Sequence, residues 1–413
     1  MRRVVVIGAG AAGTMAAIAA AGAGAKTLLL ESTADGGRKI LISGGGRCNI
    51  LPMQVDERRF VTDSPPRLLR KIVRSWPLRE QIAFFEKDLG IALAAEPESG
   101  KYFPVSNRAR DVRDGLLALA AQRGATLMAG AAVTGFAPAA GGWRIERGAA
   151  EPLRADAVVV ATGGLSVPNT GSDGRGLAML ADLGHTVHAT YPALTPLTAD
   201  PAPYAGLAGV SLPVTITARA GARSATSTGG FLFTHRGYSG PAVLDVSHVA
   251  VRSAAGDGPP ARLIVRWTPK GDADWLSALR PVGSRTVTGA VRALLPERLA
   301  GALIETARVD PGRALADLRR DERLRLIETL VRGTLPWMGH EGYRKAEVTG
   351  GGVSLAEVDP VTMESRRHRG LFLCGEVLDA FGPIGGYNFL WAWATGRAAG
   401  RGAATAAAGS ARA

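Results

Sequence analysis

The sequence predicts an α/β fold in which a domain built on a parallel sheet is interrupted by a long insertion. Three observations carry this prediction. An apolar run, Val4 to Ile7, leads into a glycine-rich turn. A second apolar run, Leu28 to Leu30, follows an alanine-rich segment of helical length. At Pro192 the sequence pattern changes to short β-branched runs broken by Pro, Gly, Ser and Thr. A strand, a helix and a strand in this order form the βαβ unit that opens a Rossmann-like, doubly wound sheet.

The turn after the first strand has the glycine spacing of a nucleotide-binding unit. Gly8 suits a tight turn, Gly10 lets the backbone approach a pyrophosphate, and Gly13 allows the helix to pack closely on the strand. The helix that begins near Ala11, followed by Ala12, directs its free amides toward the phosphates. We therefore expect a dinucleotide to bind at this turn.

Glu31 closes the second predicted strand, close to the spacing of about 20 residues at which an acid meets a ribose hydroxyl. We expect Glu31 to accept a hydrogen bond from the ribose. The alternative is a solvated carboxylate at a strand end.

A second glycine-rich loop, residues 35–49, follows Glu31. Gly44, Gly45 and Gly46 allow positive φ angles, so several amides can point into one concavity that suits phosphate. Charge-assisted hydrogen bonds from Arg47 would strengthen such a site, although an exposed flexible turn is the alternative. The same stretch supplies the further candidate cofactor-binding residues Lys39, Ser43, Cys48 and Asn49.

Further elements of the first domain follow from hydrophobic periodicity. We expect helices at 66–76, 78–89 and 109–122, and strands at 101–103, 126–128, 143–145 and 157–160. The last strand ends in a turn that approaches the cofactor from the carboxyl edge of the sheet; its residues are Ala161, Thr162, Gly163 and Gly164.

From 192 to about 267, short β-branched runs broken by Pro, Gly, Ser and Thr indicate antiparallel strands. From 272 to 335 the leucine spacing is helical, and 370–374 returns to a buried-strand pattern. We predict a nucleotide domain at 1–191 and 345–413, an inserted β-domain at 192–270 and about 335–344, and a small helical domain at 271–334.

Composition bounds the function. The chain has 413 residues, 46% hydrophobic and 21% charged, which is typical of a globular protein with more than one domain. Its net charge of +13 comes from scattered basic residues without a long run, so nucleic acid is an unlikely partner. The two cysteines form no CxxC pair and no metal motif is present.

Residues 2–25 resemble a secretory signal, but cleavage would remove the phosphate turn, so we expect a cytoplasmic protein with no membrane association.

Several blocks resemble one family across nearly the whole chain. They are Gly36 to Asn49 (GGRKILISGGGRCN), Gly100 to Pro104, Leu232 to Pro241, Gly350 to Val353, Gly375-Glu376 and Gly385 to Asn388. Together they resemble the BaiN-like, or YhiN-like, family of NAD(P)/FAD-dependent oxidoreductases. The resemblance implies a glutathione-reductase-like domain that binds FAD, with an inserted β-barrel-like domain and a small helical domain.

The resemblance also implies positions for the rest of the cofactor. Val133 falls where backbone lies against adenine in flavoproteins of this fold, and Gly375 with Glu376 falls where an acid lies near the ribityl chain. The helix that opens after Gly385 should direct its amino end at the flavin; its first candidate residues are Gly386, Tyr387, Asn388 and Phe389.

We expect hydride transfer between non-covalently bound FAD and a small organic substrate of unknown identity. Since no second GxGxxG exists, NADH or NADPH would dock transiently beneath the insertion. The catalytic candidates are His235, as a proton carrier, and Cys48, if the glycine loop lowers its pKa; a structural histidine and a buried inert thiol are the alternatives. Two rival functions stay open, a tRNA-modifying flavoprotein and a non-catalytic flavin-binding redox module.

Overall fold

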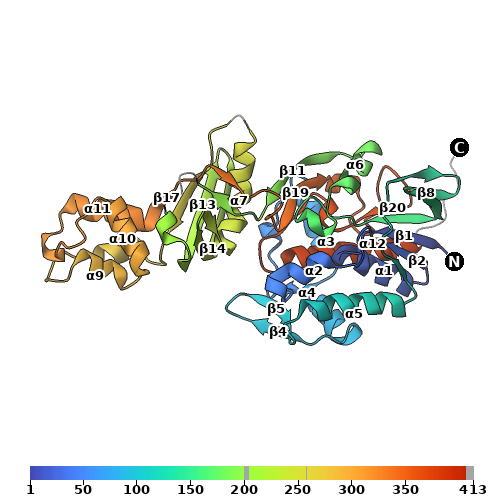
Figure 1. Cartoon of the computed structure of the whole chain (residues 1–413), viewed down its shortest axis with the longest axis horizontal. Helices are drawn as coiled ribbons and strands as arrows, with labels where there is room; N and C mark the ends of the chain where they lie inside the picture. The colour runs from blue at the N-terminus through green and yellow to red at the C-terminus, as the bar shows by residue number, and fades with distance from the viewer. Residues whose placement is uncertain (200–203, 257, 406–413) are drawn as a thin grey trace. The chain divides into compact units, whose positions relative to one another are not determined.

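The computed structural model describes residues 1–199, 204–256 and 258–405. The chain forms two compact units, the first from Met1–Tyr191 and Glu347–Ala413 and the second from Pro192–Ala346. The first unit therefore contains both ends of the colour scale in Figure 1, and the second contains the middle of the chain.

A five-stranded parallel sheet forms the centre of the first unit, which confirms the predicted α/β class. Its order is β20-β10-β1-β2-β6. Strand β20 comes from the part of the chain after the second unit, so residues from both ends are needed to complete the sheet. The strands are β1 (Arg3–Ile7), β2 (Lys26–Leu30), β6 (Thr126–Met128), β10 (Ala157–Val160) and β20 (Leu371–Leu373).

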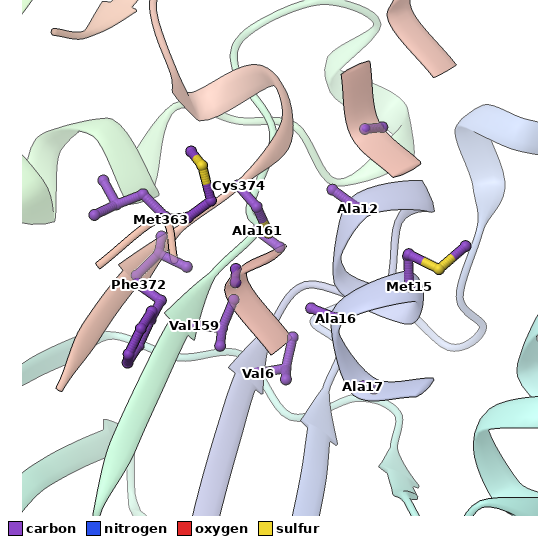
Figure 2. Packing of buried hydrophobic residues seen from close by; sticks show 14 of the residues in the cluster. Val6, Ala12, Met15, Ala16, Ala17, Val159, Ala161, Met363, Phe372 and Cys374 are labelled. Carbon is purple, nitrogen blue, oxygen red and sulfur yellow. The ribbon is translucent and has the colours of Figure 1, made fainter. Parts of the chain in front are cut away.

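Helices α1 (Ala11–Gly22) and α12 (Tyr387–Thr405) pack directly against each other beside the sheet. The contact requires small residues: a side chain at Gly396 would collide with the carbonyl oxygen of Ala12, and one at Gly400 with that of Ala16. Figure 2 shows Ala12 and Ala16 of α1 near Val159 of β10 in the same buried cluster.

The remaining elements of the first unit surround this core. The helix predicted at 78–89 is divided into α4 and a wider π-type turn at Phe84–Asp88, and the helix predicted at 66–76 ends at Arg74, just before Trp76-Pro77. Helix α12 begins at Tyr387, the residue after Gly386. Small sheets have the orders β3-β5-β4, β7-β8-β9 and β11-β19. The elements are α2 (Arg38–Ile42), β3 (Leu51–Pro52), α3 (Pro66–Arg74), α4 (Leu78–Ala83), β4 (Leu93–Glu96), β5 (Lys101–Pro104), α5 (Ala109–Gln122), β7 (Gly135–Ala139), β8 (Gly142–Arg147), β9 (Ala150–Ala155), α6 (Arg175–Asp182), β11 (Val187–Ala193) and β19 (Val348–Val353).

The second unit contains a seven-stranded antiparallel sheet of order β17-β16-β13-β14-β15-β12-β18. An aromatic cluster that includes Phe231, Phe233 and Trp267 fills its core, where Phe233 stacks on Trp267 with ring centroids 5.8 Å apart. The elements are β12 (Leu197–Thr198), β13 (Ser211–Ala220), β14 (Arg223–Thr234), β15 (Gly237–Ser239), α7 (Pro241–Ala254), β16 (Arg262–Arg266), α8 (Asp272–Ala278), α9 (Val287–Arg292), α10 (Glu297–Thr306), α11 (Arg320–Arg332), β17 (Gly333–Leu335) and β18 (Gly339–His340).

Candidate functional site

The turn between β1 and α1 has the geometry of a phosphate-binding turn. Gly8 has a φ of +101°, and a Cβ there would lie 2.5 Å from the Ala161 carbonyl oxygen. A Cβ at Gly13 would collide with the Gly8 carbonyl, whereas one at Gly10 would meet no atom of the chain within 4 Å. Gly8 and Gly13 are therefore required by internal packing, while Gly10 faces open space.

The N-terminus of α1 is free to bind an anion. Its N-cap, Gly10, supplies no side-chain hydrogen bond, and the first turn (Ala11, Ala12 and Gly13) contains no acid within the described chain. Unused amides and the helix dipole make such an end attractive to a phosphate.

Glu31 lies at the end of β2, beside this turn, and is 7% exposed. One carboxylate oxygen accepts the Ala9 amide at 2.8 Å, and the other accepts the Thr33 amide and hydroxyl, both at 2.8 Å. These bonds fix the carboxylate next to Gly8 and Gly10. The Ser32 hydroxyl also donates, at 3.3 Å, to the oxygen that accepts from Thr33, whereas the oxygen that accepts from Ala9 has no second bond among the described residues. That oxygen keeps acceptor capacity for a ribose hydroxyl.

A buried polar cluster joins four distant segments of the first unit. The Lys39 ammonium of α2 donates to Glu376 at 2.9 Å and to the Ser166 hydroxyl at 2.7 Å. Ser166 donates to the other Glu376 oxygen at 2.5 Å, and the Thr349 amide of β19 donates to that same oxygen at 2.9 Å. The structure thus brings Lys39 and Glu376 together, as two of the predicted site residues.

The charge of Glu376 is fixed by these contacts. Burial alone raises the pKa of Glu376, but the Lys39 ammonium and the hydrogen bonds from Ser166 and Thr349 outweigh it and hold the pKa below its usual value. The cluster therefore contains an ionised carboxylate beside a cation. Sequence reasoning missed Ser166 and Thr349, although Ser166 lies only two residues beyond the predicted turn at Gly163 and Gly164.

The loop with three glycines adopts the left-handed backbone that its composition requires. Gly44, Gly45 and Gly46 have φ angles of 55°, 67° and 86°, and a Cβ at Gly45 would meet open space. The Ser43 hydroxyl donates to the Ile40 carbonyl at 2.7 Å and closes the preceding turn.

Arg47 is already engaged by protein groups. Its guanidinium donates to Glu96 at 2.9 Å and to the Asn107 side chain at 2.8 Å, and it lies 3.9 Å from the centre of the Phe103 ring. These contacts tie the glycine loop to β4 and β5. A phosphate contact by Arg47, which stays a prediction, would have to be shared with this arrangement.

Cys48 is fully buried, and burial raises the pKa of its thiol to about 12. The hypothesis that the neighbouring loop lowers the pKa of Cys48 is wrong, because the side chain points into the apolar core rather than toward a cation. The other catalytic candidate, His235, is an exposed residue between β14 and β15 of the second unit, and its role stays a prediction.

Contacts at the start of α12 hold the preceding loop in place. The Tyr387 hydroxyl donates to the Gln54 carbonyl at 3.0 Å, and the Asn388 amide bonds both the N–H and the carbonyl of Gly382 at 2.8 and 2.9 Å. A Cβ at Gly386, which has a φ of 89°, would lie 2.5 Å from the Leu51 backbone. The predicted cofactor residues at this end therefore fix the backbone that leads into the helix.

Three other predicted residues lie outside these polar clusters. Phe389 stacks on Trp393 with centroids 5.3 Å apart, and Val133 is buried in the core. The Thr162 hydroxyl, in the turn after β10, is buried without a hydrogen-bond partner among the described residues. An orphaned hydroxyl here, together with the open space at Gly10, fits a bound dinucleotide such as FAD.

Asp379 forms a second buried cluster that sequence reasoning missed. Its side chain is buried and accepts hydrogen bonds from the Thr62 hydroxyl at 2.9 Å and from the Ser64 amide and hydroxyl at 2.8 and 2.7 Å. The cluster anchors the segment that leads into α3 to the loop that follows Glu376.

Over residues 1–199, 204–256 and 258–405, His, Cys, Asp and Glu side chains form no group of three that could hold a metal ion. In this same part of the chain, none of the helices combines the length and the apolar character that crossing a bilayer requires.

Comparisons with known proteins cover almost the whole chain. The family model described as the HI0933-like protein Rossmann domain matches residues 2–402. The chain is 32% identical over 413 residues to the 3-dehydro-bile acid delta(4,6)-reductase of Clostridium scindens, covering 98% of this chain and 99% of that protein. It is 32% identical over 403 residues to the ribosomal RNA dihydrouridine synthase of Escherichia coli, covering 95% of each.

A solved structure shares the fold at low sequence identity. The 3-ketosteroid delta1-dehydrogenase of Sterolibacterium denitrificans superposes with a TM-score of 0.52 at 14% identity, covering 98% of this chain and 100% of that chain. This likeness concerns the arrangement of the backbone alone.

Proposed function

We propose that this chain reduces a carbon–carbon double bond conjugated to a carbonyl group. The premise is its family: the chain belongs to the HI0933-like Rossmann domain family of FAD-dependent oxidoreductases. The observation that carries the cofactor half of the proposal is the open space at Gly10 in front of the uncapped α1 terminus. The bond class rests on what the names of two full-length relatives have in common.

Those two names describe chemically similar changes. A 3-dehydro bile acid with delta(4,6) double bonds has a carbonyl at C3 in conjugation with them. Dihydrouridine differs from uridine by two hydrogens across the C5–C6 bond, beside the C4 carbonyl. For uridine and for the Δ4 bond of the steroid, hydride adds to the carbon β to the carbonyl and a proton adds to the α carbon; for the Δ6 bond, hydride adds to the δ carbon, which the same carbonyl activates through the conjugated chain. The carbonyl makes the β carbon electrophilic, which a hydride donor requires.

Bound FAD would supply the ring that accepts and donates hydride. The α1 amides after Gly10 would hold its pyrophosphate, and Glu31 its adenosine ribose. The Lys39–Ser166–Glu376 cluster offers hydroxyl, ammonium and carboxylate groups suited to a polyhydroxyl chain. None of these contacts selects a substrate, so they account for the cofactor and not for the specificity.

The α12 terminus would tune the redox potential of the flavin. Reduced flavin carries negative charge, and a helix N-terminus stabilises a nearby anion by about 0.3 to 1 kcal/mol at an exposed site. Because 1.4 kcal/mol corresponds to about 30 mV in a two-electron couple, this contribution is limited to about 20 mV. The helix therefore adjusts the potential without determining the reaction.

A nicotinamide donor completes the proposed reaction. The sequence has one GxGxxG turn, so NADH or NADPH would bind transiently and reduce FAD. The oxidised nicotinamide would dissociate either before the acceptor binds or while the acceptor is bound next to it.

Anaerobic stopped-flow spectroscopy tests the proposal. We expect NADH or NADPH to bleach the flavin absorbance of the purified holoprotein, and a 3-oxo-4,6-diene steroid to restore it. The product should gain two hydrogens by mass spectrometry. The matched control is the same 3-oxo steroid without the double bonds, which should leave the flavin reduced. Reoxidation at equal rates by both compounds would contradict the proposal, as would failure of both nicotinamides to reduce the flavin.

A further inference from the structure

Helix α3 collects four cations on one face. Arg67, Arg70, Lys71 and Arg74 recur at intervals of three and four residues and are all exposed. Such spacing places side chains on a single stripe of a helix. The opposite face buries the apolar residues Leu69, Ile72 and Val73.

The four cations line a groove of about 640 Å³, together with Ser75, Pro360 and Val361. Glu57 is the acid that neutralises part of this charge, and it pairs with Arg74 at 2.8 Å. For Arg67, Arg70 and Lys71, no hydrogen bond or ion pair of the side chain is found within the described part of the chain.

This charge is unfavourable for the free helix. Like charges three or four residues apart destabilise a helix by about 0.2 to 0.5 kcal/mol per pair. Helix α11 is also rich in arginine, but there Arg325 pairs with Asp321 and Arg332 with Glu328. Helix α3 contains no acid, so an external anion is what would compensate its charge.

The stripe has the dimensions of a short run of phosphodiesters. From Arg67 to Arg74 the helix rises about 10 Å; a nucleic acid duplex carries one negative charge about every 1.7 Å of its axis, counted over both strands, so a stripe of this length faces several phosphates. Three of the four cations are arginines, whose planar guanidinium bonds phosphate in a bidentate manner.

A membrane surface fits this helix less well. Helices that lie on a bilayer insert an apolar face between the lipids, whereas the apolar face of α3 is buried in the protein core. The start of α3 is also anchored through Ser64 to Asp379, so the cationic stripe is held by a rigid support. These features favour a polyanion that approaches from solution.

We propose that the α3 groove binds the phosphate backbone of RNA. The inference deepens the proposed reductase function and rests on it, since it makes RNA the carrier of the conjugated bond. It revises the expectation that nucleic acid is an unlikely partner. That expectation came from the absence of a basic run, but apolar residues separate these cations in the sequence and the helix brings them together.

The test measures RNA binding by the holoprotein as fluorescence anisotropy of a labelled, mixed-sequence oligoribonucleotide at several salt concentrations. The variant Arg67→Gln/Arg70→Gln/Lys71→Gln removes three charges and keeps helix propensity. The matched control, Arg110→Gln/Arg154→Gln/Arg280→Gln, removes three exposed cations from α5, from β9 and from the segment that follows α8. Urea unfolding of each variant shows that the fold is retained.

We expect the α3 variant to bind RNA roughly tenfold more weakly or worse. The slope of log K against log salt should be shallower by about 2, because each lost contact to a single strand accounts for about 0.7. The control variant should bind like the wild type. Both variants should retain reduction of the 3-oxo-4,6-diene steroid, because α3 holds none of the proposed cofactor contacts.

Three results would overturn the inference. The α3 variant could bind RNA as tightly as the wild type, the control could lose as much affinity, or the wild type could bind phosphatidylserine vesicles or polyglutamate at least as tightly as RNA. Failure of the proposed function is separate, because it would appear in the wild type itself as a flavin that neither NADH nor NADPH reduces.

Discussion

The ammonium group of Lys39 lies 2.9 Å from the carboxylate of Glu376, although the two residues are 337 positions apart in the chain. Their side chains are 28% and 16% exposed, so water screens the pair only in part. The ion pair connects α2 to the segment after β20, and it fixes the charge of the carboxylate that lies in the candidate flavin site.

Replacement of Lys39 by Met should destabilise the protein by about 2 kcal/mol, because Glu376 would lose its partner inside a largely buried cluster. This value lies below that of a fully buried pair because both side chains retain some contact with water. Urea denaturation measures the effect. Lys26→Met, which removes an exposed lysine from β2, is the control and should change the free energy of unfolding by less than about 0.5 kcal/mol. Adding Glu376→Gln to Lys39→Met should recover part of the lost free energy of unfolding, because the unpaired charge is removed. Equal unfolding midpoints for Lys39→Met and the control would contradict a stabilising role of the Lys39–Glu376 ion pair.

Two glycines of the first turn should respond in opposite ways to substitution. Gly10→Val should give a folded but colourless protein, since Gly10 has a φ of −76° that any residue adopts and its Cβ would enter the open space. Gly13→Ala should unfold the turn, because the added methyl would collide with the Gly8 carbonyl. Circular dichroism reports the fold and absorbance near the flavin maximum reports bound FAD. A yellow Gly10→Val protein would place the pyrophosphate elsewhere.

Acid stability should depend on Glu357. Burial raises the pKa of this carboxyl, but hydrogen bonds from Arg367, Thr186 and His185 outweigh burial and lower the pKa from 4.5 to about 2. A lowered folded pKa means that the ionised form stabilises the fold fully above pH 4.5, and that this contribution disappears as the pH falls from 4.5 through about 2. The contribution is roughly 2 to 3 kcal/mol.

Chemical denaturation across this pH range tests the Glu357 assignment. The free energy of unfolding of Glu357→Gln should be lower than that of the wild type near neutral pH, and the two should converge as the pH falls through the window. Glu151→Gln, at an exposed position of β9, should keep the profile of the wild type. Parallel profiles for the wild type and Glu357→Gln would refute the role of this carboxylate.

The cysteines should be inert in the native protein. Cys48 is buried with its pKa raised to about 12, and burial also raises the pKa of Cys374. A thiol-specific reagent should therefore modify neither residue until urea unfolds the chain, and Cys48→Ala should retain reduction of FAD by the nicotinamide. Rapid modification of Cys48 in folded protein would show that the burial does not persist in solution.

The sequence was sufficient to predict features that depend on local patterns. The glycine spacing from Gly8 to Gly13 and the apolar runs on either side predict the turn, the helix and two parallel strands, because each depends on residues close together in the chain. The change of texture at Pro192 likewise predicts antiparallel strands, and the structure has them.

Features that depend on distant pairings were beyond sequence reasoning. Ser166 and Thr349 lie in no recognisable motif, and only the fold brings them to Glu376. For Cys48 the sequence left two alternatives open, a thiol activated by the glycine loop and a buried inert thiol; the structure buries the side chain, which favours the second. The α3 cations were also overlooked: a helix was predicted at 66–76, but charge was judged by runs along the sequence and not by its spacing on a helix face.

The discontinuous first unit has a consequence for synthesis of the chain. When the ribosome has completed residue 346, every residue of the second unit exists, but the parallel sheet still lacks β20 and helix α1 lacks the small-residue partner that α12 provides. The middle of the polypeptide can therefore reach its native state during translation, while the N-terminal residues must remain without their final neighbours until the last helix leaves the exit tunnel. The nucleotide turn, although made first, acquires its full support last.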